Sequence, residues 1–328
     1  MRLGKTCFPI VMVLALLLTA CGQSKDSGLL SLADNSRLEN QSSSSSPYRL
    51  GSSWDRIDLL SQPQYLQDLQ IRRAALATAK IISAFNIGTG FYLGNIDGEY
   101  LVATNYHVFA NVLTCGLTTF APLVKFTLAG VSGICKRIIV DLPDIDLIIF
   151  SLEKTAAIEN GMRDILPLRF AFDTEISKGT PLLTIGHGRA LNENLYPRLE
   201  MSSDCRVLSP DSRYKILSNP DPDDHLKLEV WSFATGCDLS PGDSGSAVIN
   251  AKSGHVLGLF WASPSPKPTV YQVSDYLRNI EVNESRDVWK NLSYAVPSVI
   301  IKDKLVDFIK DDTQLRYKRK IIQSLLNQ

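Results

Sequence analysis

Three short polar segments of the chain hold the side chains best suited to chemistry. A histidine, His107, follows an apolar run, two aspartates, Asp144 and Asp146, precede another, and a serine, Ser244, stands in a Gly-Asp-Ser-Gly tetrapeptide. A serine hydroxyl is a poor nucleophile near neutral pH, and an imidazole oriented by a carboxylate is a base that activates it. Glycines on both sides of the serine let the backbone turn tightly, which exposes the hydroxyl and brings two N–H groups to one spot. The pattern therefore predicts nucleophilic chemistry, provided that the fold brings the three segments together.

The elements that must position these residues are short strands. Twenty glycines and sixteen prolines favour turn-rich β structure, and residues 95–98 (Asn-Ile-Asp-Gly) are a turn signal between two strands. Two batches of about six strands, without helices of 10–15 residues between them, predict an all-β fold of two antiparallel six-stranded β-barrels. The expected strands are 80–85, 90–93, 100–103, 125–128, 137–140 and 147–152, followed by 181–185, 200–207, 226–233, 246–249, 256–261 and 270–273.

These strands place barrel one at about residues 78–165 and barrel two at about 175–297. Residues 58–77 have a partly helical pattern, which predicts a helix packed against the domain. After Pro297, apolar residues recur at helical spacing, so a C-terminal α-helix should bury one stripe over about residues 298–310.

The first twenty residues are typical of an export signal. Arg2 and Lys5 precede an apolar run of ten residues, 9–18, which is too short to cross a hydrocarbon core of roughly 30 Å as a mature helix. Residues 18–21 (Leu-Thr-Ala-Cys) resemble a bacterial lipobox, which implies that residues 1–20 are a lipoprotein signal peptide and that the Cys21 thiol is acylated. The alternative is an ordinary secretory signal with a chance cysteine.

The lipobox resemblance also predicts where the protein resides. A diacyl thioether together with an acylated amine gives stable anchoring, so we expect membrane attachment through the lipidated N-terminus in the bacterial cell envelope. Gly22, rather than Asp, follows the cysteine, which indicates the outer membrane, facing either the periplasm or the exterior. Residues 21–57 are polar, with serines from 42 to 46, and are expected to be a flexible tether to a domain at 58–310.

The cysteine count indicates disulfides. One cysteine lies in the signal and Cys21 would carry lipid, which leaves Cys115, Cys135, Cys205 and Cys237. An even number in an exported chain favours disulfides, and three pairings are possible. We expect Cys115–Cys135 and Cys205–Cys237, because each pair lies within one predicted barrel. A zinc site is the competing interpretation, but no Cys-x-x-Cys pair or histidine cluster supports it, so neither a metal nor a cofactor is expected.

In their order along the chain, the three polar segments resemble those of the trypsin-like (chymotrypsin-fold) serine peptidases. Thr-Asn-Tyr-His-Val around His107 and Ser-Pro-Gly-Asp-Ser-Gly around Ser244 are similar to the bacterial branch that includes the HtrA-type and glutamyl endopeptidases. The resemblance extends over about residues 78–310 and implies a chymotrypsin-like pair of barrels. It also implies that Asp146, which directly precedes the Leu-Ile-Ile strand, is the acid of the triad. Asp144 is the rival acid and is expected to be a turn residue.

The family resemblance implies a lipid-anchored serine endopeptidase that cleaves polypeptide substrates through an acyl-enzyme intermediate. His107 would take the proton of Ser244 and deliver it to the leaving amine, Asp146 would orient the imidazole, and the N–H groups of Gly242 and Ser244 would form the oxyanion hole. The alternative function is a non-catalytic envelope binding module on the same scaffold, but such relatives generally lack a triad member. An α/β-hydrolase esterase would need the order Ser, Asp, His and alternating helices.

Asp243, directly before the serine, raises the question of activation. In zymogen-activated relatives, the equivalent acid pairs with an N-terminal amine released by cleavage. No Ile-Val-Gly-Gly-like sequence precedes the domain, and the expected N-terminus is acylated, so Asp243 must find another partner or remain solvated. Arg72 and Arg73 are either a trimming site or an exposed pair on a helix. We expect an enzyme that needs no proteolytic activation.

Three residues are candidates for the substrate pocket. Asp238 lies six residues before Ser244, where trypsin-like enzymes of basic specificity have an acid at the pocket floor. It predicts cleavage after Arg or Lys, unless it serves loop structure, as in many bacterial relatives. Phe260 and Trp261 would form the opposite wall, and Phe260 stands where glutamyl endopeptidases have a histidine, so a preference for glutamate is not expected.

The charge pattern excludes one class of partner. The chain has 34 basic and 34 acidic side chains, so it has no concentrated basic field and no nucleic-acid binding is expected. Residues 311–328 are expected to be a basic tail, either a solvated helix face or a contact with anionic headgroups. The remaining histidines, His187, His225 and His255, are expected to have structural or surface roles.

Overall fold

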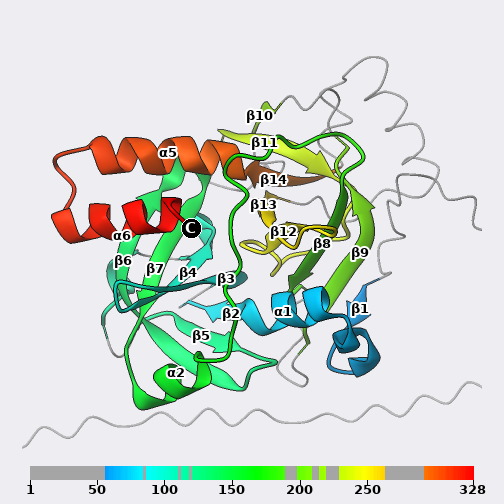
Figure 1. Ribbon diagram of the computed structural model, residues 1–328, viewed down its shortest axis with the longest axis horizontal. Coiled ribbons are helices and arrows are strands. Elements are labelled where there is room, and N and C mark those ends of the chain that lie inside the picture. Colours follow the sequence, from blue (N-terminus) through cyan, green and yellow to red (C-terminus); the bar gives the residue numbers. More distant parts are fainter. Residues whose placement is uncertain are drawn as a thin grey trace, which may run out of the picture. The chain divides into compact units, whose positions relative to one another are not determined.

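Strands dominate the part of the chain that the computed structural model describes (Figure 1). All described residues belong to one compact unit of the chain. The signal peptide, Cys21, the tether up to residue 55, the strand expected at 270–273 and His225 lie outside the described residues. The described residues are 56–83, 86–109, 112–117, 120–188, 198–208, 214–218, 229–262 and 292–328.

Six strands form a closed antiparallel barrel in the order β2-β3-β4-β7-β6-β5. This is the first predicted barrel, and its interior is filled by buried apolar side chains such as Val102, Phe126 and Phe150. The strands are β2 (Thr78–Ile82), β3 (Ile87–Ile96), β4 (Glu99–Thr104), β5 (Leu123–Phe126), β6 (Val131–Leu142) and β7 (Leu147–Leu152).

The predicted turn between β3 and β4 is confirmed. Asp97 and Gly98 both have positive φ, at 52° and 80°, and Ile96 pairs with Glu99 across the hairpin. Two consecutive residues with positive φ match the twist of the flanking strands, which is why Asp-Gly favours a two-residue hairpin.

The second set of strands forms an eight-stranded antiparallel sheet in the order β1-β9-β8-β12-β13-β14-β11-β10. A bridge between Val207, just after β9, and Thr235 of β11 brings the two sides of the sheet together at one end. The six strands from β9 to β11 thus form a partly closed barrel, in agreement with the predicted chymotrypsin-like architecture. The strands are β1 (Ile57–Asp58), β8 (Pro181–Gly186), β9 (Glu200–Arg206), β10 (Lys215–Ser218), β11 (Glu229–Thr235), β12 (Ala247–Asn250), β13 (Val256–Ala262) and β14 (Ser293–Pro297).

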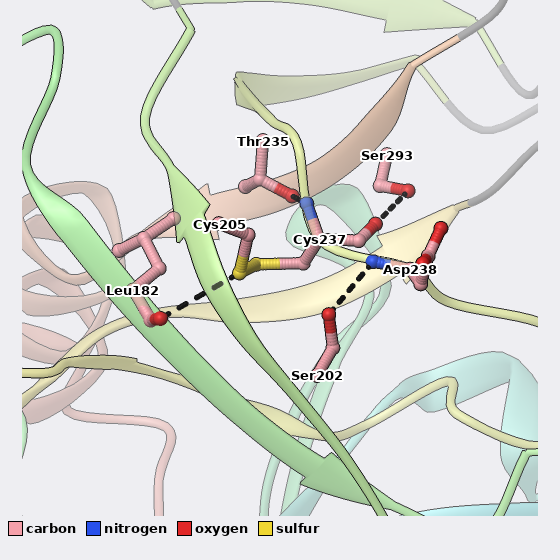
Figure 2. Close-up of a disulfide and its surroundings, with 7 residues drawn as sticks. All are labelled: Leu182, Ser202, Cys205, Thr235, Cys237, Asp238 and Ser293. Atoms are coloured by element: carbon pink, nitrogen blue, oxygen red, sulfur yellow. Dashed lines mark hydrogen bonds between the residues drawn. A yellow bond between two sulfur atoms is a disulfide. The ribbon is translucent and has the colours of Figure 1, made fainter. Parts of the chain in front are cut away.

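Both predicted disulfides are present in the structure. Cys115 bonds to Cys135 within the first barrel. Cys205 on β9 bonds to Cys237 just after β11 (Figure 2). This second disulfide therefore joins β9 to β11 along the same seam, the line where these two strands meet, as the bridge between Val207 and Thr235.

The helical segment before the first barrel begins later than its sequence pattern predicts. Pro63 opens a short 3-10 helix, η1 (Pro63–Gln67), and the chain then leaves the helical conformation at Asp68. The Asp68 side chain caps a new helix, α1 (Leu69–Ala77), by accepting hydrogen bonds from two backbone N–H groups. Arg73 of this helix donates to the carbonyl of Pro167, at 2.5 Å, whereas Arg72 is exposed.

The predicted C-terminal helix is α5 (Ser298–Lys310), and it buries Ile301, Leu305 and Phe308. The segment expected to be a basic tail contains a further helix, α6 (Arg316–Leu326), which packs beside α5 (Figure 1). Ile321, Ile322 and Leu325 of α6 are buried, and this apolar stripe explains why residues 311–328 dock on the domain instead of extending from it.

A short helix, α2 (Ala156–Gly161), completes the regular helices of the described residues. Among these residues, no helix combines the length and apolar character required to cross a membrane. Arg56 and Ile57, which the sequence places in the tether, belong to the folded part, because β1 pairs Ile57 with Met201 of β9.

Candidate active site

His107 lies where β4 leaves the first barrel. The chain passes through Asn105 into a short 3-10 helix, η2 (Tyr106–Val108). The Asn105 side-chain amide and the Tyr106 N–H both donate to the carbonyl of Asp146, at 2.9 and 3.1 Å, and Asn86 Nδ2 donates to the His107 carbonyl, at 2.9 Å. These bonds fix the backbone on both sides of the imidazole.

Asp146 is fully buried and holds the imidazole directly. It follows the 3-10 helix η4 (Pro143–Ile145) with a left-handed φ of 50°, a conformation that aspartate tolerates better than most residues. Its Oδ2 lies 2.7 Å from His107 Nδ1, and its Oδ1 accepts the His107 backbone N–H at 3.0 Å. Because a carboxylate only accepts, the neutral imidazole carries its proton on Nδ1, and the basic lone pair is on Nε2.

The rival acid lies elsewhere. Asp144 is half exposed, and its Oδ2 pairs with the Lys304 ammonium of α5. Of the two candidate acids, Asp146 is the one that contacts His107.

Ser244 lies on a loop that two threonines of the first barrel hold in place. Thr89 of β3 donates its N–H to the Ser244 carbonyl and its hydroxyl to the Gly242 carbonyl, both at 2.8 Å. Thr104 of β4 in turn donates its hydroxyl to the Thr89 carbonyl at 2.6 Å. The serine loop of the second barrel is therefore pinned to the strands that lead to His107.

Close backbone approach places the serine loop beside the histidine segment. A Cβ on Gly245, which has a φ of 89°, would lie 2.0 Å from the Thr89 carbonyl oxygen and 3.1 Å from the Asn105 N. A Cβ on Gly88 would lie 2.5 Å from the Val108 side chain and 3.1 Å from the Ser244 carbonyl oxygen. The neighbours of Ser244 thus pack against the neighbours of His107, and the structure brings the three predicted segments together.

The serine loop also presents two N–H groups of the kind that an oxyanion hole needs. Asp243 N–H donates to the Ser240 carbonyl, and Gly245 N–H donates to the Phe260 carbonyl. Within the described ranges, the N–H groups of Gly242 and Ser244 donate no hydrogen bond to the protein. These are the two groups that the sequence predicts for the oxyanion hole.

Asp243 has a partner that the sequence does not reveal. The carboxylate is fully buried, and Arg56 pairs with it through both terminal nitrogens: Nη2 donates to Oδ1 at 2.8 Å, and Nη1 pairs with Oδ2. Burial lowers the pKa of Arg56, but the carboxylates of Asp243 and Glu200 more than offset that effect, so the pKa is raised and the guanidinium stays charged. No local pattern marks Arg56, because it lies 187 residues from Asp243.

His187 lies close to this ion pair but does not take part in it. Its Nδ1 donates to the Arg198 carbonyl at 2.8 Å, and its backbone N–H donates to the Thr89 hydroxyl at 2.9 Å. Burial lowers the pKa of His187 to about 4, so the ring is neutral near pH 7.

The three candidate pocket residues lie in the second barrel. Asp238 follows the disulfide cysteine Cys237 and is 6% exposed, and its N–H donates to the Ser202 hydroxyl at 2.9 Å (Figure 2). Phe260 is 1% exposed within the apolar core of the barrel, and Trp261 is 3% exposed, with its indole N–H bonded to the Ser232 hydroxyl. Phe260 and Trp261 therefore offer almost no side-chain surface to a ligand.

The sequence matches the model of one protein family, and the fold is similar to that of solved structures. The model of a family described as "Trypsin-like peptidase domain" matches residues 88–259. No curated protein matches the sequence significantly. Among solved structures, the inactive form of a serine-to-alanine mutant of Rv3671c from M. tuberculosis is 16% identical, with a TM-score of 0.50 over 76% of this chain and 95% of that one. A serine endoprotease from Yersinia pestis is 15% identical, with a TM-score of 0.45 over 74% of this chain and 66% of that one. At such identities, the likeness to solved structures concerns the fold.

Proposed function

This chain belongs to the trypsin-like peptidase family and is a serine protease, and from that premise we propose that it cleaves peptide bonds through a triad of His107, Asp146 and Ser244. The observation that carries the proposal is the 2.7 Å contact between His107 Nδ1 and Asp146 Oδ2. This contact fixes the tautomer in which Nε2 can act as a base.

The first half of the reaction forms an acyl-enzyme. Ser244 Oγ bonds to the carbonyl carbon of the substrate while its proton passes to His107 Nε2. The carbonyl oxygen becomes an oxyanion, which accepts hydrogen bonds from the N–H groups of Gly242 and Ser244. The C–N bond then breaks, and the imidazolium gives its proton to the leaving amine. Asp146 stabilises the imidazolium while it exists.

The second half returns the enzyme to its starting state. A water molecule attacks the ester carbonyl and gives a proton to His107 Nε2. The bond to Ser244 Oγ breaks, the imidazolium reprotonates that oxygen, and the carboxylic acid product leaves. The same two N–H groups stabilise both tetrahedral intermediates.

The acyl-enzyme can be trapped directly. Wild-type protein mixed with a p-nitrophenyl ester and quenched in acid should gain the mass of one acyl group, and the modified peptide should contain Ser244. Ser244→Ala should gain no mass, and Asp144→Asn serves as a matched control that should acylate like the wild type. A folded wild-type protein that hydrolyses peptides without acylation at Ser244 would contradict the proposal.

We further propose that the mature protein is attached to a membrane of the cell envelope through lipid on Cys21, with the lipobox-like sequence before it as support. Triple acylation would give stable attachment. The full chain, expressed in a bacterium with lipoprotein processing, should then partition into the detergent phase of Triton X-114. Cys21→Ser should move the protein to the aqueous phase, and unchanged partitioning of this variant would contradict the proposal.

Substrate preference has two interpretations that one variant separates. If the Asp238 carboxylate meets a basic side chain, Asp238→Asn lowers kcat/KM for cleavage after Arg and Lys but not after apolar residues. If Asp238 supports the loop next to the Cys205–Cys237 disulfide, the same change lowers cleavage of all peptides equally. A peptide library assayed with both proteins decides between the two.

A further inference from the structure

Beneath the serine loop lies a cluster of buried charges that the triad does not use. Arg56 is only 2% exposed in its side chain, and it faces two buried carboxylates, those of Asp243 and Glu200. Nη1 lies 3.2 Å from Glu200 Oε2 and 3.1 Å from the Ser240 hydroxyl. A buried charge is costly unless it is paired and hydrogen-bonded, and here one guanidinium donates hydrogen bonds to the Asp243 carboxylate and the Ser240 hydroxyl and forms an ion pair with Glu200.

The N-terminal end of the described domain delivers Arg56 to this place. β1 directly follows Arg56, and it pairs with β9 through Ile57 and Asp58. Arg56 Nη2 also donates to the Glu200 carbonyl of β9, at 3.3 Å. A two-residue strand is weak by itself, so the ion pair and the strand hold each other in place.

The other end of the ion pair is the serine loop itself. Asp243 Oδ2 accepts hydrogen bonds from the Ser240 N–H at 2.8 Å and from the Ser240 hydroxyl at 3.1 Å. Asp243 lies between Gly242 and Ser244, whose N–H groups are the proposed oxyanion donors. Its carboxylate is therefore the point at which Arg56 can fix the conformation of those donors.

Two glycines, one at the end of β8 and one just after it, leave room for this arrangement. A Cβ on Gly188 would lie 2.0 Å from Arg56 Nη1 and 2.3 Å from Asp243 Oδ2, and a Cβ on Gly186 would lie 2.3 Å from Asp243 Oδ1. Any side chain at Gly188 must displace the ion pair, because Cβ atoms do not approach other atoms that closely.

We propose that Arg56 is a positioning residue of the protease: its guanidinium holds the Asp243 carboxylate and so keeps the Gly242 and Ser244 N–H groups aimed at the oxyanion. This inference rests on the proposed function. The positive charge that orders the loop belongs to a side chain and not to an N-terminal amine that cleavage must release. The protease is therefore active without proteolytic activation. Loss of the segment that carries Arg56 inactivates it.

The test compares substitutions at two arginines in the full-length protein. Arg56→Gln removes the charge, Arg56→Lys keeps it, and Arg198→Gln is the matched control. Arg198 also lies near Glu200, at 3.6 Å from Oε1, but its side chain is 45% exposed. Each protein is assayed for kcat and KM on a fluorogenic peptide, for inhibition by a peptide aldehyde, and for thermal unfolding.

Arg56→Gln should lower kcat by about 10²-fold, the effect of losing one oxyanion donor, while KM changes by less than about threefold. Affinity for the aldehyde, which forms a tetrahedral adduct on the serine, should fall in parallel with kcat/KM. Arg56→Lys should retain most of the activity that Arg56→Gln loses, and Arg198→Gln should stay within about twofold of the wild type.

The inference is overturned if folded Arg56→Gln keeps the wild-type kcat, or if Arg56→Gln and Arg198→Gln lose activity equally. If Arg56→Gln does not fold, the kcat values of Arg56→Lys and Gly188→Ala test the inference in its place. Gly188→Ala keeps every charge but displaces the guanidinium, so it should lower kcat, and wild-type kcat in this variant would overturn the inference. If the proposed function itself fails, the wild type does not acylate at Ser244, which distinguishes the two failures.

Discussion

Removal of the Cys205–Cys237 disulfide should weaken the domain and the active site together. The double variant Cys205→Ala and Cys237→Ala opens the seam where β9 meets β11, which otherwise depends on a single bridge between Val207 and Thr235 and the hydrogen bonds beside it. Both cysteines are buried, so alanine leaves no unpaired polar group behind.

The size of the stability effect follows from the length of the closed loop. The cysteines are 32 residues apart, for which the chain-entropy relation gives about 3.7 kcal/mol at 25 °C. The Cys115–Cys135 pair is 20 residues apart, which gives about 3.3 kcal/mol. The two double-alanine variants should therefore lose similar amounts of unfolding free energy.

The effect on activity should separate the two disulfides. Cys237 directly precedes Asp238 and lies close in sequence to the serine loop, and the Ser293 hydroxyl donates to its carbonyl at 3.0 Å (Figure 2). The Cys115–Cys135 disulfide lies within the first barrel. Loss of Cys205–Cys237 should therefore lower kcat/KM by at least about tenfold, and loss of Cys115–Cys135 by much less.

Urea unfolding and peptide hydrolysis at a temperature where all three proteins are folded provide the assay. A loss of less than about 1 kcal/mol for the Cys205–Cys237 variant would show that the seam is stable without the disulfide. Equal losses of kcat/KM in the two variants would refute the link between this seam and the serine loop.

Three further substitutions test separate parts of the account. Asp146→Asn should lower kcat by about 10⁴-fold, because an amide favours the wrong imidazole tautomer, and a loss below about tenfold in stopped-flow assays would contradict that role. Because the pKa of His187 is lowered to about 4, the unfolded chain takes up a proton as the pH falls below about 6.5 and the folded chain does not. Urea unfolding should therefore show that the free energy of unfolding falls by about 3 kcal/mol between pH 6.5 and 4. His187→Gln should abolish this loss, and the control His255→Gln, at an exposed histidine, should retain it. The same pH dependence of the unfolding free energy in both variants would contradict the role of His187. Gly245→Ala should lower both stability and kcat, because its Cβ would meet the Thr89 backbone, whereas Gly98→Ala, with open space and a φ of 80°, should cost only about 1–2 kcal/mol by calorimetry. Equal effects of the two glycine substitutions would show that the close approach is unimportant.

Features encoded by local patterns are predictable from this sequence. Asp97 and Gly98 predict their hairpin because few residues adopt two consecutive positive φ angles. The spacing of Ile301, Leu305 and Phe308 predicts one buried helix face, and each disulfide joins cysteines of one barrel. The choice of Asp146 over Asp144 follows from the family resemblance, in which the acid directly precedes an apolar strand.

Features that depend on tertiary contacts are not predictable in this way. Arg56 is one polar residue at the end of a polar stretch, and its role arises only because β1 pairs with β9 beside Glu200. The helix α6 has an apolar stripe, but its four basic residues suggest a solvated tail until α5 provides a surface for it. Phe260 matches a pocket position of related enzymes in sequence, yet its side chain packs in the core.

The central claim is that Ser244 is a nucleophile activated by His107, and a phosphonofluoridate tests it most directly. Intact-mass spectrometry followed by peptide mapping should find one adduct, on Ser244, in the wild type and none in Ser244→Ala. His107→Ala, shown to be folded by circular dichroism, should react at least about 10³-fold more slowly. An adduct elsewhere, or equal labelling rates in wild type and His107→Ala, would contradict the account.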